Sequence, residues 1–378
     1  MTLIFSYSNL RLSAFICVPF IKNMNLLNIY DYERAAAEAM PETFYAYYAG
    51  GVADNLTLHE NRAAFDRLKL LPRIFRDVSH ISLETELMGV KRPSPTLIAP
   101  AAMHKLGHAD GELATARAAH SLGVPQILST LSSVAVEEVT AVGHPVWFQL
   151  YIFRDRAWSQ AIVQRAVAAG CEALVVTVDV PVQGLRENLQ RINFSIPAEI
   201  LLPNLNRPGD SQDATSLLHL VNQNFDPGLT WQDIDWLRSF TDLPIWVKGI
   251  LRADDAQRAA AAGVQGIIVS NHGGRQLDTA VTPIEALPAI ATAVGDQIEL
   301  ILDGGIRRGS DVLKALALGA NAVSLGRAPL WGLAVNGEAG VRHVLQILHN
   351  ELSNVMAQCG CTTIAELTSD LIFKPPQI

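Results

Sequence analysis

The chain is poor in cysteine. Only four of its 378 residues are cysteine, and they are Cys17, Cys171, Cys359 and Cys361. These positions form neither the paired spacing of a zinc site nor a plausible disulfide framework. We therefore expect no metal centre and a reducing compartment, for which the cytoplasm is the simplest choice.

The chain is also poor in charge and has no block rich in lysine or arginine. Charged residues make up 17%, and 29 Lys and Arg are outnumbered by 37 Asp and Glu, giving a formal net charge of -8. This balance argues against nucleic acid as a main partner. A transmembrane helix needs about 20 predominantly apolar residues, and no stretch is clean enough, so we expect no membrane partner.

Residues 1–23 differ from the rest of the chain. The stretch 3–20 is rather apolar, but polar residues interrupt it, and it lacks the basic start and small-residue cleavage site of a signal peptide. We expect an extension that is either untranslated, with Met24 as the true start, or disordered. Residues 24–378 are expected to form a single domain.

A short apolar run followed by an Ala-rich helical pattern recurs along the chain. Eight such runs have the length of buried parallel strands. Helical segments lie between most of them, at 111–121, 158–169, 253–262 and 310–318, and several end at glycine. Eight units predict an α/β fold, a (β/α)8 TIM barrel. A doubly wound sheet is the alternative, but its Gly-rich turn and downstream acidic residue are missing. The runs are 96–99, 125–128, 146–148, 173–176, 244–247, 266–269, 299–302 and 322–325.

One long segment breaks this rhythm. Residues 188–228, after the fourth run, contain several prolines and no strand–helix unit. A loop of this length at the catalytic end of a barrel is typical of a lid. Its apolar residues, at 200–202, at 217–218 and at Phe225, would shield a site from water.

The residues that follow the apolar runs are chemically rich. The stretch 270–278, which reads SNHGGRQLD, delivers a base, His272, and a guanidinium, Arg275, to one strand end. Histidine is suited to accept a proton near neutral pH, and arginine holds a carboxylate with two bonds. Because all strand ends of a barrel meet at one mouth, these groups predict an enzyme that deprotonates a small organic acid.

The last two strand ends predict a phosphate site. Gly304, Gly305 and Gly326 allow close approach to the backbone, and Arg307 and Arg327 supply positive charge. Barrels commonly bind phosphate at this place, near a helix N-terminus, and Ser310 is positioned to cap a helix that begins at residue 311. At the fifth strand end, Lys248 could form a Schiff base or stand beside an electron-rich cofactor ring. The residues alone leave both readings open.

These motifs resemble one family, the FMN-dependent L-2-hydroxy acid oxidases, which includes glycolate oxidase, lactate oxidase and mandelate-oxidising enzymes. The resemblance extends from about residue 26 to residue 365 and implies that FMN is the cofactor of the barrel domain. It rests on FYAYYAGG at 44–51, APAAM at 99–103, QLY at 149–151, TVD at 177–179, VKG at 247–249, SNHGGRQLD at 270–278 and DGGIR at 303–307.

The resemblance implies a role for each matching residue. His272 would accept the substrate proton with Asp179 as its partner, Tyr151 would bond the substrate hydroxyl, and Lys248 would stabilise negative charge at flavin N1. The substrate carboxylate would be held by Arg186, Arg275 and Tyr47. The isoalloxazine ring would be contacted by Pro100, Ala101, Ala102, Ser129, Gln149, Thr177 and Ser270. The ribityl phosphate would be held by Asp303, Gly304, Gly305, Arg307, Gly326 and Arg327.

Departures from the family pattern bear on the substrate. Leu131 stands where glycolate oxidases have tryptophan, so lactate or a larger acid should fit better than glycolate. Leu185 replaces a polar residue before Arg186 and makes the base of the lid more apolar. The resemblance implies an (S)-2-hydroxy acid oxidase, EC 1.1.3.-, that reduces O2 to H2O2 and assembles as a homotetramer.

Two other functions remain open from the sequence. One is a dehydrogenase, of lactate or mandelate type, that passes electrons to a quinone or cytochrome. The other is a flavin-binding barrel without catalysis, which the intact set of polar strand-end residues disfavours.

Overall fold

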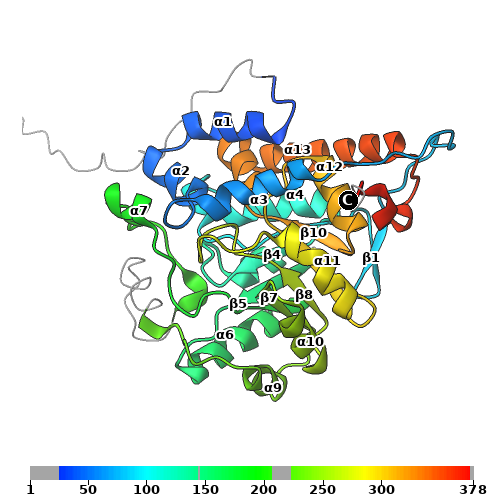
Figure 1. Cartoon of the computed structure of the whole chain (residues 1–378). Helices are drawn as coiled ribbons and strands as arrows, with labels where there is room; N and C mark the ends of the chain where they lie inside the picture. Colours follow the sequence, from blue (N-terminus) through cyan, green and yellow to red (C-terminus); the bar gives the residue numbers. More distant parts are fainter. Residues whose placement is uncertain (1–24, 144, 207–222, 375–378) are drawn as a thin grey trace, which may run out of the picture.

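The computed structural model describes residues 25–143, 145–206 and 223–374 (Figure 1). The expected extension at residues 1–23 and the lid residues Leu217 and Leu218 lie outside this part of the chain. The segment that was expected to break the βα rhythm does connect two barrel strands. Its described residues include short helical elements that the sequence did not indicate, α7 (Glu187–Arg191) and the 3-10 helix η2 (Pro203–Leu205), because so few residues do not produce a helical pattern.

The predicted (β/α)8 barrel is confirmed. Eight parallel strands close into a ring in which the last strand pairs with the first, so the alternative of an open sheet is excluded. Both ends of each strand lie within three residues of the corresponding ends of the predicted run. The strands are β3 (Thr96–Ile98), β4 (Gln126–Ser129), β5 (Val146–Leu150), β6 (Ala173–Thr177), β7 (Ile245–Ile250), β8 (Gly266–Val269), β9 (Glu299–Asp303) and β10 (Ala322–Leu325).

Helices surround the barrel, as the Ala-rich segments predicted. The four predicted segments correspond to α4, α6, α10 and α12, and the glycines that follow these helices have positive φ, as helix C-terminal glycines do. The helices that follow the strands are α4 (Gly111–Ser121), α5 (Val136–Thr140), α6 (Arg156–Ala168), α9 (Gln232–Arg238), α10 (Ala253–Ala261), α11 (Pro283–Val294), α12 (Gly309–Ala317) and α13 (Arg327–Gln358).

From residue 25 to the first barrel strand, the chain forms three helices and a hairpin. The helices are α1 (Ile29–Ala39), α2 (Glu42–Ala49) and α3 (Leu56–Arg67), and α1 packs along α13 (Figure 1). The hairpin consists of β1 (Thr85–Leu87) and β2 (Val90–Arg92). Leu87 of the hairpin packs with the side chains inside the barrel, so it closes the end of the barrel opposite the catalytic mouth.

The inside of the barrel is built in two layers. The lower layer is apolar and buried, and Trp147 and Trp246 fill its centre with ring centroids 5.1 Å apart. Side chains two positions apart on a strand share a face, so the residue two positions further along each strand belongs to the upper layer. The lower layer consists of Leu97, Ile127, Trp147, Val175, Trp246, Ile268, Ile301 and Ala322. Open space is therefore restricted to the carboxyl ends of the strands.

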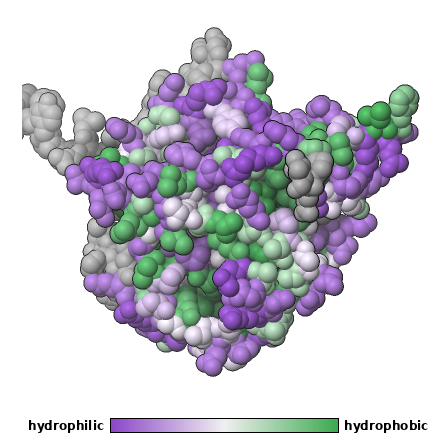
Figure 2. All heavy atoms as spheres, in the orientation of Figure 1, coloured by the Kyte–Doolittle hydropathy of each residue, from purple (hydrophilic) through white to green (hydrophobic). Residues whose placement is uncertain are grey.

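The surface bears apolar side chains at one projecting segment. Between α3 and β1 the chain extends away from the body at the right of Figure 1, and Figure 2 shows apolar surface at its tip. Leu71, Ile74 and Phe75 belong to this segment and are exposed, Phe75 completely. No helix in the described part of the chain is long and apolar enough to span a membrane.

Candidate active site

A cavity of about 720 Å³ lies at the carboxyl ends of the barrel strands. Its size is that of a site for a cofactor and a small substrate. Of the residues predicted for the site, Asp179 and Ser270 lie behind the wall and all others line the cavity. The latter are Tyr47, Pro100, Ala101, Ala102, Ser129, Leu131, Gln149, Tyr151, Thr177, Arg186, Lys248, His272, Arg275, Asp303, Gly304, Gly305, Arg307, Gly326 and Arg327.

His272 and Asp179 form a pair at the cavity wall. The Nδ1 atom of His272 lies 2.8 Å from Oδ1 of Asp179. The other ring nitrogen, Nε2, does not contact this carboxylate. His272 has a left-handed backbone with φ 57, and its amide donates to Oγ of Ser270 at 3.0 Å. A turn after β8 thus aims the imidazole across the barrel mouth toward a carboxylate that follows β6.

The electrostatics keep this imidazole neutral. Burial lowers the pKa of His272, Lys248 and Arg186 lower it further, and Asp179 opposes them, so that the pKa lies below its usual 6.5. Burial raises the pKa of Asp179, but the interactions with His272 and Lys248 outweigh burial and hold it below its usual range. A neutral imidazole beside a carboxylate is an arrangement for a general base.

The pH dependence of kcat/KM should report the protonation of His272 in its pair with Asp179. Activity is lost as pH falls and His272 becomes protonated, so we expect an acid limb with a midpoint below 6.5. Asp179→Asn removes the group that raises the pKa of His272, and the midpoint should therefore move to still lower pH while the plateau falls. Steady-state kinetics across pH measure both effects. Asp254→Asn, at an exposed carboxylate, is the control, and a midpoint that rises in Asp179→Asn would contradict the assignment.

Two guanidinium groups face the cavity beside this base. Nη1 of Arg275 donates to the carbonyl oxygens of Tyr47 and Gly50, each at 2.8 Å. Burial lowers the pKa of Arg275 far below its usual value, with contributions from nearby Arg186 and Arg327. Nε of Arg186 is buried without a partner among the described residues. The repulsion between these cations is relieved when an anion binds between them, which suits a carboxylate substrate.

Polar side chains form the upper layer of the barrel in two hydrogen-bonded groups. In the first, Ser129 donates to Gln149 at 3.2 Å and Gln149 donates to Thr177 at 3.0 Å. In the second, Nζ of Lys248 lies 2.9 Å from Oγ of Ser270 and 3.0 Å from Asp303. Burial lowers the pKa of Lys248, but Asp303 and Asp179 more than offset it and raise the pKa. Lys248 is therefore a charged ammonium, and the Schiff-base reading, which requires a neutral amine, is disfavoured.

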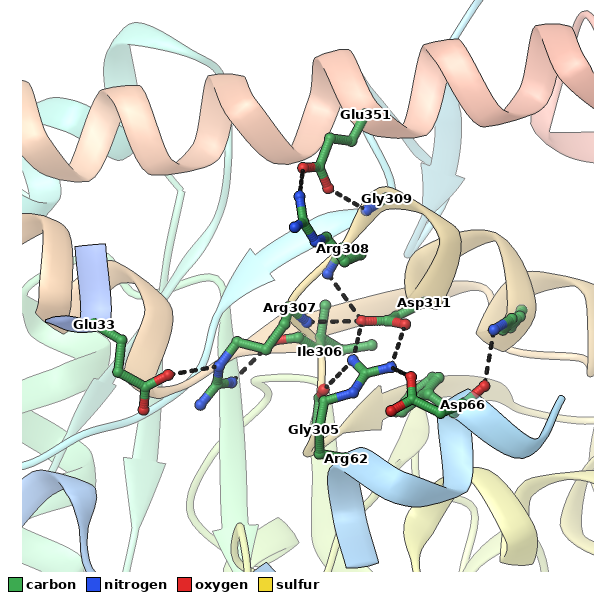
Figure 3. Close-up of polar contacts among 12 residues, drawn as sticks. Glu33, Arg62, Asp66, Gly305, Ile306, Arg307, Arg308, Gly309, Asp311 and Glu351 are labelled. Carbon is green, nitrogen blue, oxygen red and sulfur yellow. Dashed lines mark hydrogen bonds and ion pairs between the residues drawn. The ribbon is translucent and has the colours of Figure 1, made fainter. Parts of the chain in front are cut away.

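The loop between β9 and α12 lies at the other end of the cavity and is held by hydrogen bonds and ion pairs (Figure 3). Asp311, which is buried, accepts the backbone N–H groups of Arg307 at 2.9 Å and Arg308 at 2.8 Å, and it pairs with Arg62 of α3. Nη1 of Arg62 also donates to the carbonyl oxygen of Gly305 at 3.1 Å. The prediction that Ser310 caps α12 is wrong, because the helix begins at Gly309 and Asp311 binds the free amides instead.

Two glycines at this end, Gly305 and Gly326, have different surroundings. A Cβ atom at Gly305 would lie 2.0 Å from the carbonyl oxygen of Asn61, so a side chain cannot be accommodated there. A Cβ atom at Gly326 would meet no protein atom within 4 Å, so it would extend into open space. The positive charge comes from Arg307, whose Nε lies 3.5 Å from Glu33, and from Arg327.

Comparison with known proteins identifies the family. A model described as FMN-dependent dehydrogenase matches residues 36–374. The chain belongs to this family. It is thus an FMN-dependent enzyme of the 2-hydroxy acid oxidase and dehydrogenase type, and its cofactor is FMN.

Curated relatives and solved structures agree with this assignment. L-lactate oxidase of Nostoc sp. is 47% identical, over 92% of this chain and 98% of the relative, and 2-hydroxyacid oxidase 1 of Mus musculus is 44% identical over 93% and 97%. The structure of a mandelate oxidase superposes with a TM-score of 0.84 at 42% identity, covering 92% of this chain and 98% of that chain. A mutant of a chimeric (S)-mandelate dehydrogenase gives a TM-score of 0.87 at 39% identity, with coverages of 92% and 99%.

The cavity of this FMN-dependent dehydrogenase family member has the chemistry that FMN requires. The hydroxyl and amide groups of Ser129, Gln149 and Thr177 can form hydrogen bonds with the polar edge of an isoalloxazine ring. The charged Lys248 suits the negative charge that a flavin ring gains. The open space at Gly326 and the arginines beside it suit the phosphate.

Several residues that shape this site were not predicted from the sequence. Asn61 of α3 and Asn271 form a reciprocal amide pair with distances of 2.9 and 2.7 Å, and this pair supports the turn that carries His272. Gly249 has φ 116, and a Cβ atom there would lie 2.6 Å from Cβ of Asp179, so only glycine lets Asp179 reach the imidazole. No sequence signal marks Asn61, because its partner is 210 residues away.

Proposed function

We propose that the protein oxidises an L-2-hydroxy acid to the 2-keto acid and reduces O2 to H2O2. The observation that carries the proposal is the His272–Asp179 pair beside two cavity-lining guanidinium groups. In this proposal Arg186, Arg275 and Tyr47 bind the carboxylate, and His272 accepts a proton from the substrate. FMN, held in this cavity, would supply the two-electron redox chemistry that couples removal of the second substrate hydrogen to reduction of O2 to H2O2.

Tyr151 and Asp179 assist the base in distinct ways. Burial raises the pKa of Tyr151 and nearby Asp179 adds to the effect, so its phenol stays protonated and can donate to the substrate oxygen that becomes the keto oxygen. Asp179 holds the imidazole through Nδ1 and stabilises the imidazolium that forms after proton transfer. Lys248, charged and buried, neutralises negative charge beside the ring of the cofactor.

We propose lactate or a larger acid, rather than glycolate, as the substrate. The support is the apolar wall of the cavity, in which Tyr47 stacks on Phe194 with centroids 4.9 Å apart and Tyr151 contacts Phe225 edge to face at 5.1 Å. Leu131 is buried and completes this wall. The Nostoc L-lactate oxidase and the mandelate oxidase structures give the same support.

The size of residue 131 should control this preference. In Leu131→Trp the larger ring occupies space that a substrate side chain uses, so kcat/KM for lactate and mandelate should fall about tenfold or more relative to glycolate. Steady-state kinetics with the three acids measure the ratio. Leu27→Trp, at an exposed position that does not line the cavity, is the matched control. An unchanged ratio in Leu131→Trp would show that residue 131 does not limit the substrate.

One experiment tests the oxidase proposal directly. The flavin absorbance is followed by anaerobic stopped-flow mixing with L-lactate, glycolate, L-mandelate or 4-hydroxymandelate, and the bleached enzyme is then mixed with O2. We expect rapid bleaching by lactate or a larger acid and rapid recovery with O2. Rapid bleaching with slow recovery would instead indicate a dehydrogenase with a quinone or cytochrome acceptor, and absence of bleaching by every acid would contradict both functions.

We also propose that residues 24–378 act as one FMN-binding domain and assemble as a homotetramer. The exposed apolar residues Leu71, Ile74 and Phe75 support a contact between subunits. Light scattering in solution measures the molar mass, and a monomeric mass would contradict the proposal. The cytoplasm remains the proposed compartment, supported by the free thiols of Cys171, Cys359 and Cys361.

A further inference from the structure

We propose that the hydroxyl of Ser324 is a binding contact for the ribityl chain of FMN. Ser324 belongs to β10, two positions after Ala322 of the apolar lower layer, so its side chain lies in the upper, polar layer. The other strands place Ala99, Ser129, Gln149, Thr177, Lys248, Ser270 and Asp303 at the equivalent position. The inference rests on the proposed function, in which FMN binds in this cavity.

Ser324 differs from the other polar members of the layer in having no hydrogen-bond partner within the described part of the chain. Its Oγ atom is buried and makes no hydrogen bond with any residue that the structure describes, and the residue lines the cavity with 1% of its surface exposed. By contrast, Ser270 and Asp303, one strand or two away, bond one another at 2.6 Å. A buried hydroxyl without a partner costs free energy, which a polar ligand group in the cavity can recover.

The position of Ser324 identifies the part of FMN that it would meet. In the sheet register Ser324 lies beside Asp303, and it precedes Gly326, the open glycine of the phosphate end, by two residues. The ring-binding amide and hydroxyl groups belong to strands β4 to β6, on another side of the mouth. A group that spans from ring to phosphate is a polyol chain, and its hydroxyls both donate and accept, as serine does.

Flavins of different length test the contact in apoprotein. Ser324→Ala should weaken FMN and riboflavin alike, by about 3- to 10-fold, the range of one neutral hydrogen bond. Lumiflavin, which carries a methyl group in place of the ribityl chain, should bind both proteins equally. Fluorescence titration of the apoproteins with each flavin measures the affinities. Equal weakening of all three flavins, weakening of FMN alone, or no weakening would each overturn the proposal.

Thermal unfolding separates this role from a structural one. Because Ser324→Ala removes an unsatisfied buried hydroxyl, the apoprotein should unfold at an unchanged or higher temperature. Ser159→Ala is the matched control, since Ser159 is equally buried but bonds the amide of Phe153 at 2.9 Å. That variant should lose thermal stability and keep its flavin affinities. A lower unfolding temperature in Ser324→Ala apoprotein would indicate that the hydroxyl serves the fold and would contradict a ligand contact.

Discussion

The His272→Asn enzyme is expected to bind FMN as the unmodified protein does and to turn over its 2-hydroxy acid about 10²- to 10⁴-fold more slowly, the range of a general base. Asparagine is chosen because it tolerates the left-handed backbone at φ 57. The loss should appear in kcat, since His272 acts on the proton and the arginines bind the carboxylate. Steady-state kinetics and the flavin content of the purified protein measure the two effects.

A matched variant makes the His272 result interpretable. His59 is an exposed histidine on α3, away from the cavity, and His59→Asn should leave kcat and flavin content unchanged. Loss of flavin from His272→Asn would mean that the turn after β8 had collapsed. Turnover within threefold of the unmodified enzyme would show that another group accepts the proton.

Arg186→Met should produce the second largest effect. Methionine keeps much of the aliphatic stem and removes the charge, so kcat/KM should fall about 10²- to 10³-fold, mainly through KM, as expected for loss of a desolvated charge contact. A second readout follows from the electrostatics. Arg186 lowers the pKa of His272, so the acid limb of kcat/KM should move to higher pH in this variant.

Two controls define the carboxylate contact. Arg191→Met changes an arginine on α7 that pairs with Glu187 at the surface, and it should leave KM unchanged. The amide of the same hydroxy acid carries no charge, so Arg186→Met should reduce activity with the acid far more than activity with the amide. Equal losses for acid and amide would show that Arg186 acts on the fold of the lid segment and does not bind the carboxylate.

Local sequence patterns were sufficient for the barrel. A run of three or four mostly apolar residues is too short for a helix and is typical of a strand covered on both faces, and eight such runs separated by helical segments leave few topologies. The residues that directly follow the runs then lie at the barrel mouth, as was predicted for Lys248 and Asp303. Most of the other candidate site residues were named from the resemblance of the motifs to one family.

Contacts between distant segments could not be predicted in this way. From the sequence, Asp311 is an ordinary residue of a helix N-terminus. In the structure it pairs with Arg62, 249 residues earlier, and holds the loop at the phosphate end of the cavity. Arg327 was expected to bind phosphate, and its guanidinium also donates to the backbone of Tyr48, Gly273 and Gly50. These roles depend on which backbone groups lie within hydrogen-bond distance, which only the packed chain determines.

The sequence by itself determined the α/β barrel, the face of each strand and the chemical character of the mouth, because these depend on neighbours a few positions apart. Only the tertiary structure decided which groups are paired. It brings Asp179 within 2.8 Å of His272, 93 residues away. It places Asp303 3.0 Å from Lys248, and it leaves the Ser324 hydroxyl without a partner among the residues that the structure describes. Hydrogen bonds and pKa values depend on the distances between groups and on their burial. Closure of the barrel determines these distances and this burial.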